Sequence, residues 1–407
     1  MTNFTNNSLI MDKVSDRVEQ LEASQTLAMS QRSKDLQLQG VNVINLSVGE
    51  PDFPTPDFVK DAAKKAIDDN ITFYSPVSGF ADLLDAISAK LKRENNLNYS
   101  PAQIVVSNGA KQSLANVILA LIDKGDEVII PAPYWVSYIE QVKIAEGKSI
   151  ILKTGIENDF KITPKQLADA ITPRTKALFL CSPSNPTGSV YTRNELAALA
   201  EVLAQHPNVF VISDEIYEHI NFVGKHETIA QFEHIADRVI VINGVSKGYA
   251  MTGWRIGYCA APKWLAKACS KLQGQMTSGP NSIAQKAALA AINSDASYPA
   301  MMCKAFAIRR DLVLDKLSKI PGFKTNVPQG AFYVFSEVSQ LLGKVYKDEI
   351  ISTSSDLSMF LLNTANVALV PGCAFGAPEF IRFSYAASED QLKEALDRVA
   401  KAIAMLK

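Results

Sequence analysis

One short stretch of the chain carries the first candidate for chemistry. Residues 246–258 read Ser-Lys-Gly-Tyr-Ala-Met-Thr-Gly-Trp-Arg-Ile-Gly-Tyr, which sets Lys247 in a loop of small residues and Arg255 just ahead of an apolar run. Lysine forms a Schiff base with a carbonyl when its amine can lose its proton. Arg255 and the hydroxyl of Ser246 are suited to hold a phosphate. The grouping favours an aldehyde cofactor with a phosphate over an ordinary exposed Ser-Lys turn.

A second segment is suited to bind the same anion. Residues 107–112, Ser-Asn-Gly-Ala-Lys-Gln, follow the apolar run 104–106 and precede a helical pattern. Free backbone N–H groups and the positive end of the helix dipole would face an anion there. Taken alone, the segment is also explained by an ordinary tight turn. Together with Ser246 and Arg255 it predicts the other half of a phosphate site.

Two further polar residues follow runs that are typical of buried strands. Asp214 comes after 209–212, and Asn185 lies in the Pro-flanked loop 182–188. Ligands of parallel sheets gather beyond the carboxyl ends of strands. A carboxylate against a pyridine nitrogen turns the ring into an electron sink, and an amide can donate to a phenolate-like oxygen, which Tyr217 could also reach. Two alternatives remain open for Asp214, which could be a helix cap or a metal ligand. The loop 182–188 could simply be a rigid turn.

Arg382 interrupts the apolar run 380–383 near the end of the chain. An unpaired arginine on an inward face would be costly, so it should meet a carboxylate. That carboxylate can belong to the protein, as in a structural salt bridge, or to a ligand. Both interpretations remain open from the sequence.

The elements that must position these residues alternate between strands and helices. Short apolar runs, each followed by a loop of small residues and a helical pattern, predict a largely parallel α/β sheet with strands at 104–106, 127–130, 177–180, 209–212, 239–242 and 256–260. Thr192 and Glu195 form a predicted capping box at a helix start. A helical pattern over 12–39, broken around 24–26, precedes a strand pattern at 41–46.

The pattern changes after about residue 294. A long helix passes through Arg309 and Arg310, and a closing helix begins with Ser388 and Gln391. Strands are predicted at 331–335, 367–370 and 380–385. We expect this part to form a smaller α+β domain.

Composition bounds the class of protein. The 407 residues are 47% hydrophobic and 20% charged, and 41 basic against 42 acidic residues leave a net charge of -1. There is thus no whole-chain field to attract nucleic acid or an anionic membrane. The five scattered cysteines fit reduced thiols. No signal peptide or long apolar run is evident, so a cytoplasmic protein is expected, with residues 1–9 disordered.

Two other classes of site find little support in the sequence. The four histidines show no ligand spacing with cysteine or acidic residues, so no metal is expected. No G-x-S-x-G elbow appears, which disfavours a serine hydrolase.

With these motifs in hand, the chain resembles the class I aminotransferases of the fold-type I pyridoxal-phosphate enzymes, and among them the prokaryotic-type aspartate aminotransferases. The resemblance runs from about Val14 to Leu406. It rests on the 246–258 segment, on Ser-Pro-Ser-Asn-Pro-Thr-Gly at 182–188 and on Asp-Glu-Ile-Tyr at 214–217. It implies a large domain with a mostly parallel seven-stranded sheet flanked by helices, and a smaller α+β domain built from both termini. The expected division is 1–48 for the N-terminal arm and part of the small domain, 49–295 for the large domain, and 296–407 for the small domain.

The resemblance also implies a cofactor, pyridoxal 5'-phosphate, and the residues that bind it. Lys247 is the expected Schiff-base lysine and, with Asp214 and Tyr217, the expected catalytic set. Asp214 faces the pyridine nitrogen, while Asn185 and Tyr217 face the ring oxygen. The remaining expected cofactor contacts are Trp135 stacked on the ring, the backbone of Ala110 and Lys111, the side chains of Ser246 and Arg255, and Tyr74. Tyr74 is expected to reach the phosphate of a neighbouring subunit, which implies a homodimer with shared sites.

Substrate contacts are implied in the same way. Gly49 and Arg382 match the binders of the α-carboxylate, with Trp135 and Asn185 beside them. No counterpart is evident for the arginine that eukaryotic-type enzymes use on the distal carboxylate. In the prokaryotic-type subgroup, Lys111 and Thr26 match the residues for that carboxylate.

The implied activity is transamination between L-aspartate, or a related L-amino acid, and 2-oxoglutarate by a ping-pong mechanism. Alternatives within the family act on prephenate, aromatic amino acids or alanine. A more remote alternative is a pyridoxal-phosphate-sensing regulator, for which no basic helix-turn-helix pattern is evident. The expected partners are therefore amino acids, 2-oxo acids and a second copy of the chain, without nucleic acid or membrane.

Overall fold

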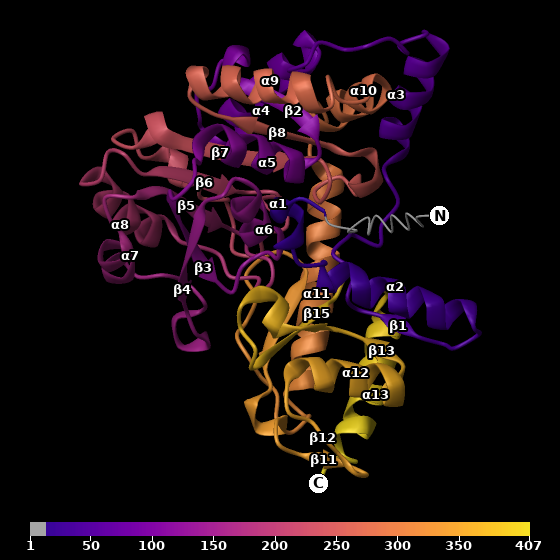
Figure 1. The fold of residues 1–407 in the computed structure, drawn as a ribbon. Helices are drawn as coiled ribbons and strands as arrows, with labels where there is room; N and C mark the ends of the chain where they lie inside the picture. Colours follow the sequence, from indigo (N-terminus) through magenta and orange to yellow (C-terminus); the bar gives the residue numbers. More distant parts are fainter. Residues whose placement is uncertain (1–13) are drawn as a thin grey trace, which may run out of the picture.

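The computed structural model describes residues 14–407. The expectation of disorder for residues 1–9 lies outside the described residues, as does the start of the predicted N-terminal arm. Figure 1 shows a broad upper part, which contains the large sheet, above a smaller part formed mostly by the end of the chain.

A seven-stranded sheet organises the larger part. Its strand order is β2-β8-β7-β6-β5-β3-β4. All neighbours are parallel except β8, which runs antiparallel to both β2 and β7. In chain order the strands are β2 (Ile104–Asn108), β3 (Glu127–Ala132), β4 (Lys148–Lys153), β5 (Thr175–Cys181), β6 (Phe210–Asp214), β7 (Val239–Gly244) and β8 (Ile256–Ala260). The mostly parallel seven-stranded sheet is thus confirmed.

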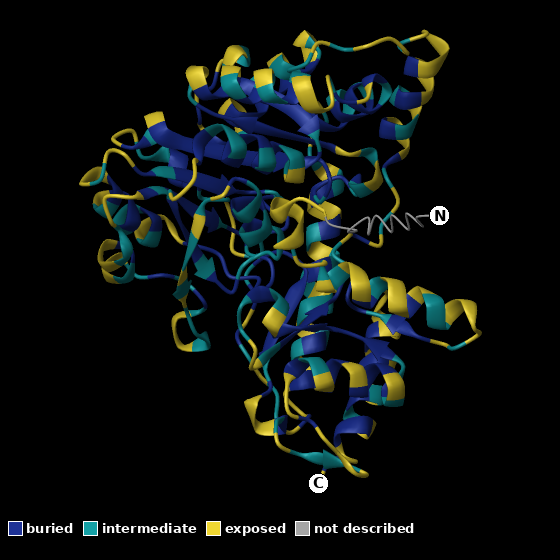
Figure 2. Ribbon diagram, in the orientation of Figure 1, coloured by how far each residue is buried: buried dark blue, intermediate teal, exposed yellow. Residues whose placement is uncertain are grey.

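Helices cover both faces of this sheet. The chain forms α3 (Asp57–Asp68), α4 (Ala81–Asn95), α5 (Ala110–Leu121), α6 (Ser137–Ile144), α7 (Pro164–Ala170), α8 (Arg193–Ala204), α9 (Lys263–Met276) and α10 (Ser282–Ile292) around it. Adjacent strand residues enter different cores: Val211 packs with residues of α4, α8 and α10, whereas Ile212 packs with residues of α5, α6 and α9. Successive side chains of a strand point to opposite faces, so both faces must be apolar. Figure 2 accordingly shows the central strands buried.

The smaller part is built around a four-stranded antiparallel sheet of order β14-β15-β10-β9. Its strands are β9 (Lys324–Thr325), β10 (Tyr333–Glu337), β14 (Val370–Pro371) and β15 (Phe380–Ser384). Its helices are α11 (Ser297–Leu317), α12 (Ser354–Ala365) and α13 (Glu389–Ile403), and a short hairpin joins β11 (Val345–Tyr346) to β12 (Glu349–Ile350).

The N-terminal segment joins this smaller part. It contains α1 (Asp16–Glu19), α2 (Gln25–Leu38) and β1 (Ile44–Asn45). Strand β1 pairs in parallel with β13 (Val367–Ala368), and Ile44 and Leu46 lie in the same core as residues of α11 and α13. Residues from the two ends of the chain therefore share one core. The domain boundaries at 48/49 and 295/296 stay predictions.

Most predicted elements are present, with differences at their ends. The capping boxes of Thr192 with Glu195 and of Ser388 with Gln391 are confirmed at α8 and α13. The strand predicted over 41–46 is wrong in length, because only Ile44–Asn45 finds a pairing partner. The strand predicted over 367–370 divides into β13 and β14, which join different sheets. Strand β4 was not predicted, because lysines flank its short apolar run.

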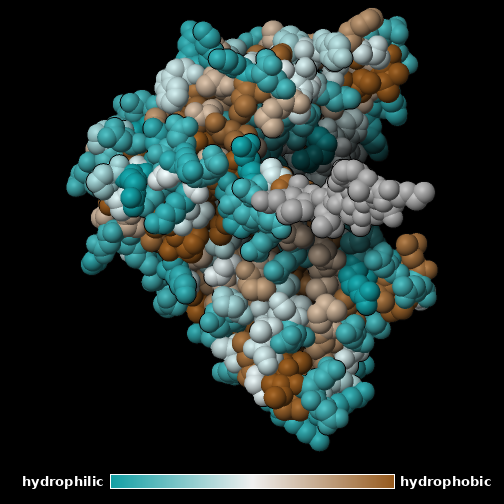
Figure 3. Space-filling model, in the orientation of Figure 1, coloured by the Kyte–Doolittle hydropathy of each residue, from teal (hydrophilic) through white to brown (hydrophobic). Residues whose placement is uncertain are grey.

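Within residues 14–407, no helix combines the length and apolar character needed to cross a membrane. The face shown in Figure 3 is mostly hydrophilic, with apolar patches scattered among polar side chains.

Candidate active site

A cavity of about 330 Å³ brings together residues from distant parts of the chain. Its walls come from the ends of the sheet strands, from α2 and α5, and from β10 and β15 of the smaller part. Every predicted site residue except Tyr74 lines it: Thr26, Gly49, Ala110, Lys111, Trp135, Asn185, Asp214, Tyr217, Ser246, Lys247, Arg255 and Arg382. Asp214 is the last residue of β6, so the cavity lies where ligands of parallel sheets bind.

The amine of Lys247 lies in this cavity with a neutral partner. Its Nζ donates to the backbone oxygen of Gly49 at 2.5 Å. The pKa of Lys247 is lowered to about 8, chiefly by desolvation; Glu50 acts to raise it, and the guanidinium groups of Arg255 and Arg382 act to lower it. A lysine whose pKa lies near neutral pH gains and loses its proton readily, which suits a nucleophile and proton carrier.

The carboxylate of Asp214 is also held by neutral groups. Tyr138 donates its hydroxyl proton to Oδ2 at 2.7 Å, and the backbone N–H of Ile216 donates to Oδ1 at 3.3 Å. Burial raises the pKa of Asp214 to about 6, although these two hydrogen bonds lower it. Asp214 is therefore mostly ionised at neutral pH, and no cation is paired with it among the described residues. A carboxylate in this state can pair with a protonated ring nitrogen.

Arg382 is buried without a counter-ion from the described residues. Its Nη1 donates to Asn185 Oδ1 and its Nη2 to the backbone oxygen of Ser47, both at 2.7 Å. Its Nε has no partner among the described residues, and both hydrogen bonds of its other guanidinium nitrogens go to neutral oxygens. The structural salt bridge left open by the sequence is therefore absent from residues 14–407. A buried guanidinium with free donors is suited to bind a carboxylate ligand.

The Arg382 contact also sets the orientation of Asn185. Because Asn185 Oδ1 accepts from the guanidinium, the amide NH₂ group is left to donate. Tyr217 lies in the same cavity, with its hydroxyl 2.8 Å from that of Tyr333. Asn185 and Tyr217 thus offer donors to a ring oxygen.

An anion site is formed where α5 begins. As at any helix N-terminus, the first N–H groups, here those of Ala110 and Lys111, have no intrahelical acceptor. A Cβ atom on Gly109 would collide with the guanidinium of Arg255, and one on Gly257 would collide with the backbone nitrogen of Ala110. The two glycines therefore allow Arg255 and the helix start to approach each other closely. Arg255 is held there by the backbone oxygen of Thr252, at 2.9 Å from Nη1.

A second cationic side chain lies on another wall of the cavity. The Nζ atom of Lys111 is 5.0 Å from the centroid of the Trp135 ring. Desolvation, and then the charge of Arg255, lowers the pKa of Lys111. Thr26 is brought to the same cavity by the start of α2, where the Ser24 side chain accepts the N–H of Leu27.

Tyr74 lies outside this cavity. It is 97% exposed, and the neighbouring Phe73 is 81% exposed. Both residues lie in the segment between α3 and α4. Two adjacent exposed aromatic side chains are suited to an interface with another chain.

Several cavity residues were not predicted from the sequence. They are Ser24, Leu27, Leu114, Val136, Ser137, Tyr138, Cys181, Ile216, Thr252 and Tyr333. Tyr138 had a usable signal, because it lies only three residues after Trp135, and in the structure its backbone N–H donates to the Trp135 oxygen at 3.0 Å. Tyr333 had none, because it belongs to an apolar strand run whose partner in space is 116 residues away.

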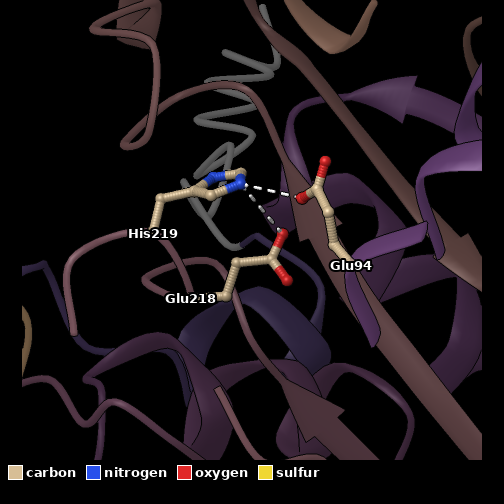
Figure 4. Close-up of side chains that lie close together, drawn as sticks. All are labelled: Glu94, Glu218 and His219. Atoms are coloured by element: carbon tan, nitrogen blue, oxygen red, sulfur yellow. Dashed lines mark hydrogen bonds and ion pairs between the residues drawn. The ribbon is translucent and has the colours of Figure 1, made fainter. Parts of the chain in front are cut away.

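A partly buried cluster of charged residues supports the segment that carries Asp214 and Tyr217. Figure 4 shows His219 between Glu94 and Glu218, with Nε2 3.1 Å from Glu94 Oε2. Lys90 forms a close ion pair with Glu218, and Asn95 donates to the other Glu218 oxygen at 3.0 Å. Burial raises the pKa of Glu218, but Lys90 and the histidines outweigh it, so the pKa is lowered overall.

The sequence showed no metal-ligand spacing, yet the fold brings ligand atoms of Glu94, Glu218 and His219 within 4.8 Å of one another. The ammonium of Lys90 already lies between the two carboxylates. A metal ion would therefore have to displace a buried cation that is hydrogen-bonded to Glu218 and to Asn95. We interpret the cluster as a structural support.

Comparison with known proteins identifies the family. A sequence profile described as "Aminotransferase class I and II" matches residues 41–399. The chain belongs to this aminotransferase family. It is an enzyme of the aminotransferase type, as the resemblance implied, and the family depends on pyridoxal phosphate.

Individual relatives cover almost the whole chain. It is 47% identical to an aspartate/prephenate aminotransferase of Nitrosomonas europaea, over 95% of this chain and 99% of the relative. It is also 47% identical to an aspartate aminotransferase of Geobacillus stearothermophilus, over 95% and 98% of the two chains.

Solved structures confirm the fold of this aminotransferase. The crystal structure of the aspartate aminotransferase from Rhizobium meliloti matches with a TM-score of 0.93 at 44% identity, over 97% of this chain and 100% of that one. The enzyme from Thermus thermophilus with maleate matches with a TM-score of 0.91 at 40% identity, over 96% and 100%.

The lowered pKa of Lys247 leads to a first prediction. In the protein without cofactor, the Lys247 amine should titrate with a midpoint near pH 8 rather than the usual value of about 10.4, because the cavity disfavours its charged form. NMR of isotopically labelled lysine side chains measures the midpoint, and Lys247→Arg identifies the signal by its loss. A midpoint above pH 10 for Lys247 would contradict the desolvated geometry.

Proposed function

We propose that this aminotransferase transfers the amino group of L-aspartate to 2-oxoglutarate, with pyridoxal 5'-phosphate as cofactor. The observation that carries the proposal is the convergence of Lys247, Asp214 and Arg382 on one cavity, each held by neutral groups and none neutralised by an ion pair among the described residues. Such groups can pair with the aldehyde, ring nitrogen and carboxylate that this reaction brings together.

The residues present fit this cofactor. The start of α5, with Ser246 and Arg255, would hold the phosphate, and the glycines at 109 and 257 leave the room that a phosphate cradle needs. Asp214 would hold the ring nitrogen, Asn185 and Tyr217 the ring oxygen, and Trp135 the ring face. When bound, pyridoxal phosphate supplies an aldehyde for the amine and a ring that accepts electrons from the substrate Cα.

The chain's own residues would then handle the proton. The Lys247 Nζ atom, once unprotonated, is the base that takes the proton from the Cα atom of the amino donor. In the reverse half-reaction it gives a proton back to the Cα atom of the acceptor. Its hydrogen bond to the Gly49 oxygen places it in the cavity. The ionised Asp214 keeps its partner nitrogen protonated during this exchange. Because donor and acceptor use the same site in turn, ping-pong kinetics are expected.

Substrate choice would rest on two cations. Arg382 has free donors for the α-carboxylate, and Lys111 lies on the cavity wall beside Trp135 for the distal one, with Thr26 nearby. The Thermus thermophilus relative was crystallised with maleate, a dicarboxylate. Both L-aspartate and 2-oxoglutarate carry two carboxylates, so one pair of cations can serve both.

Prephenate is a second candidate acceptor. The Nitrosomonas europaea relative, at 47% identity, is named for aspartate and prephenate. Prephenate also carries two carboxylates, so the same cations could bind it. Turnover of purified enzyme with glutamate or aspartate and prephenate, followed by product analysis, tests this candidate.

The exposed pair Phe73 and Tyr74 supports a homodimer with shared sites. In this arrangement the side chain of Tyr74 would extend across the interface and contact the cofactor phosphate bound by the neighbouring subunit. A cytoplasmic location stays a prediction from the cysteine usage.

Replacement of the lysine tests the reaction itself. Lys247→Ala should lower kcat for aspartate by about 10²–10⁴-fold or more, because it removes the proton carrier. Steady-state assays measure kcat, and the loss of the visible cofactor band on mixing with single amino acids reports the first half-reaction. Lys263→Ala, an exposed lysine on α9, serves as the control. A Lys247→Ala enzyme that folds and turns over at the wild-type rate would overturn the assignment.

Replacement of Lys111 tests the substrate class. Lys111→Ala should raise KM for aspartate about 10–100-fold, because a charge-assisted hydrogen bond contributes about 1.5–3 kcal/mol. KM for alanine, which lacks the distal carboxylate, should change little and provides the internal control. Equal changes for aspartate and alanine would point to a general effect on the cavity instead.

Mixed subunits test the shared site. Lys247→Ala and Tyr74→Ala homodimers should each have low activity, whereas a hybrid of the two contains one site with Lys247 from one subunit and Tyr74 from the other. Activity should therefore rise when the two variants are unfolded and refolded together. Activity that merely averages the two homodimers would show that Tyr74 serves its own subunit or none.

A further inference from the structure

Tyr333 lies where the two parts of the molecule meet at the cavity. It is in β10 of the smaller part, is completely buried and lines the cavity. Its hydroxyl is 2.8 Å from the hydroxyl of Tyr217, which belongs to the segment after β6 of the large sheet. The two rings meet edge to face, with centroids 5.8 Å apart.

The same side chain also contacts the carboxylate-binding region. The guanidinium carbon of Arg382 lies 4.4 Å from the centroid of the Tyr333 ring. Strand register explains this contact: Arg382 of β15 pairs with Phe335, which lies two residues from Tyr333 on the same face of β10. Tyr333 is thus a diagonal cross-strand neighbour of Arg382.

A third contact reaches the backbone that holds Lys247. A Cβ atom on Gly49 would lie 2.8 Å from the Tyr333 hydroxyl, so a side chain at this position would press on it. The oxygen of Gly49 is the acceptor of the Lys247 amine. Tyr333 therefore packs against three residues of the predicted site at once.

The number of protons that each hydroxyl can donate decides which tyrosine is the donor in the hydrogen bond between Tyr217 and Tyr333. A hydroxyl has one proton to donate and can accept as well. If Tyr217 donates its proton into the cavity, Tyr333 must be the donor in the bond between them. A hydroxyl that accepts one hydrogen bond becomes a stronger donor in the next, because chains of hydrogen bonds polarise one another.

We propose that Tyr333 is a positioning residue that turns the Tyr217 hydroxyl toward the ring oxygen of the bound cofactor and links Tyr217 to the carboxylate-binding Arg382. The inference rests on the proposed function, because it assumes that Tyr217 faces a pyridoxal ring. It goes further by coupling occupancy of the carboxylate site to the strength of the hydrogen bond on the cofactor.

The main test compares hydroxyl deletions by absorbance. Tyr333→Phe keeps the ring over Arg382 and removes only the donor to Tyr217. The pH midpoint of the visible absorbance of the cofactor-loaded protein should move upward, in the same direction as in Tyr217→Phe but by about a tenth to a third as much. In the Tyr217→Phe background, Tyr333→Phe should add no further shift. An unchanged midpoint in Tyr333→Phe, or fully additive shifts, would overturn the proposal.

Maleate, an unreactive dicarboxylate, tests the link to Arg382. Maleate binding should shift the absorbance midpoint of the wild-type protein, and Tyr333→Phe should reduce that shift while the dissociation constant of maleate changes less than twofold. Tyr333→Leu, which also removes the ring, should raise that dissociation constant several-fold. A maleate-induced shift that is fully retained in Tyr333→Phe would show that the two sites are not coupled through this residue.

A matched tyrosine separates this role from packing. Tyr385 is buried in the same core, and its hydroxyl donates to the backbone oxygen of Ala331 at 3.2 Å. Tyr385→Phe should leave the midpoint and the maleate shift unchanged, and thermal unfolding of both variants reports any loss of stability. Equal midpoint shifts in Tyr385→Phe and Tyr333→Phe would show a general packing effect and overturn the proposal.

Failure of the proposed function would look different. A wild-type protein that binds no pyridoxal phosphate, measured as its dissociation constant, and shows no visible band would overturn the proposed function and this inference with it. Normal binding and transamination in the wild type, together with wild-type spectra in Tyr333→Phe, would overturn the inference alone.

Discussion

Buried charge held only by neutral groups is the constraint on which this structure depends. Lys247 is bonded to a backbone oxygen, Asp214 to a hydroxyl and an N–H group, and Arg382 to an amide and a backbone oxygen. Dipoles of this kind offset part of the desolvation penalty without neutralising the charge. Each group therefore keeps its charge, or its capacity to change it, for a ligand. A protein ion pair at any of them would satisfy the group and close the site.

The contrast with the neighbouring charged cluster makes this clear. Glu218 and Lys90 are about as deeply buried as Asp214 and Arg382, yet they pair with each other directly. Such a pair fixes the backbone around it and has little left to offer a ligand. Glu218 directly follows Tyr217, so the neutralised cluster supports the same segment that carries Asp214, whose charge is not neutralised by an ion pair among the described residues. Support and chemistry are thus divided between adjacent residues of one segment.

The cavity also requires both parts of the molecule. The large sheet provides Asp214 and the helix start at α5, while the smaller part provides Arg382 and Tyr333 from β15 and β10. The start of α2 covers another side with Ser24, Thr26 and Leu27. A movement between these parts would change the distance between Arg382 and the cofactor residues. The contact of Tyr333 with both Tyr217 and Arg382 crosses this junction.

The sequence by itself determined the parts that depend on local order. Apolar runs with small-residue loops predicted six of the seven strands of the large sheet, all but β4, because burial on two faces demands continuous apolar residues. The motif at 246–258 and the residues Asp214, Asn185 and Arg382 were found by residue type and position, and the structure brings them to one cavity. Only the tertiary structure decided what each charged group is paired with. The sequence left open a salt bridge for Arg382, showed nothing of Tyr333 and gave no spacing for Glu94 with His219, since these contacts join residues more than a hundred positions apart. Pairing of this kind is set by strand register and by packing between elements, and neither can be predicted from residues that are neighbours in the sequence.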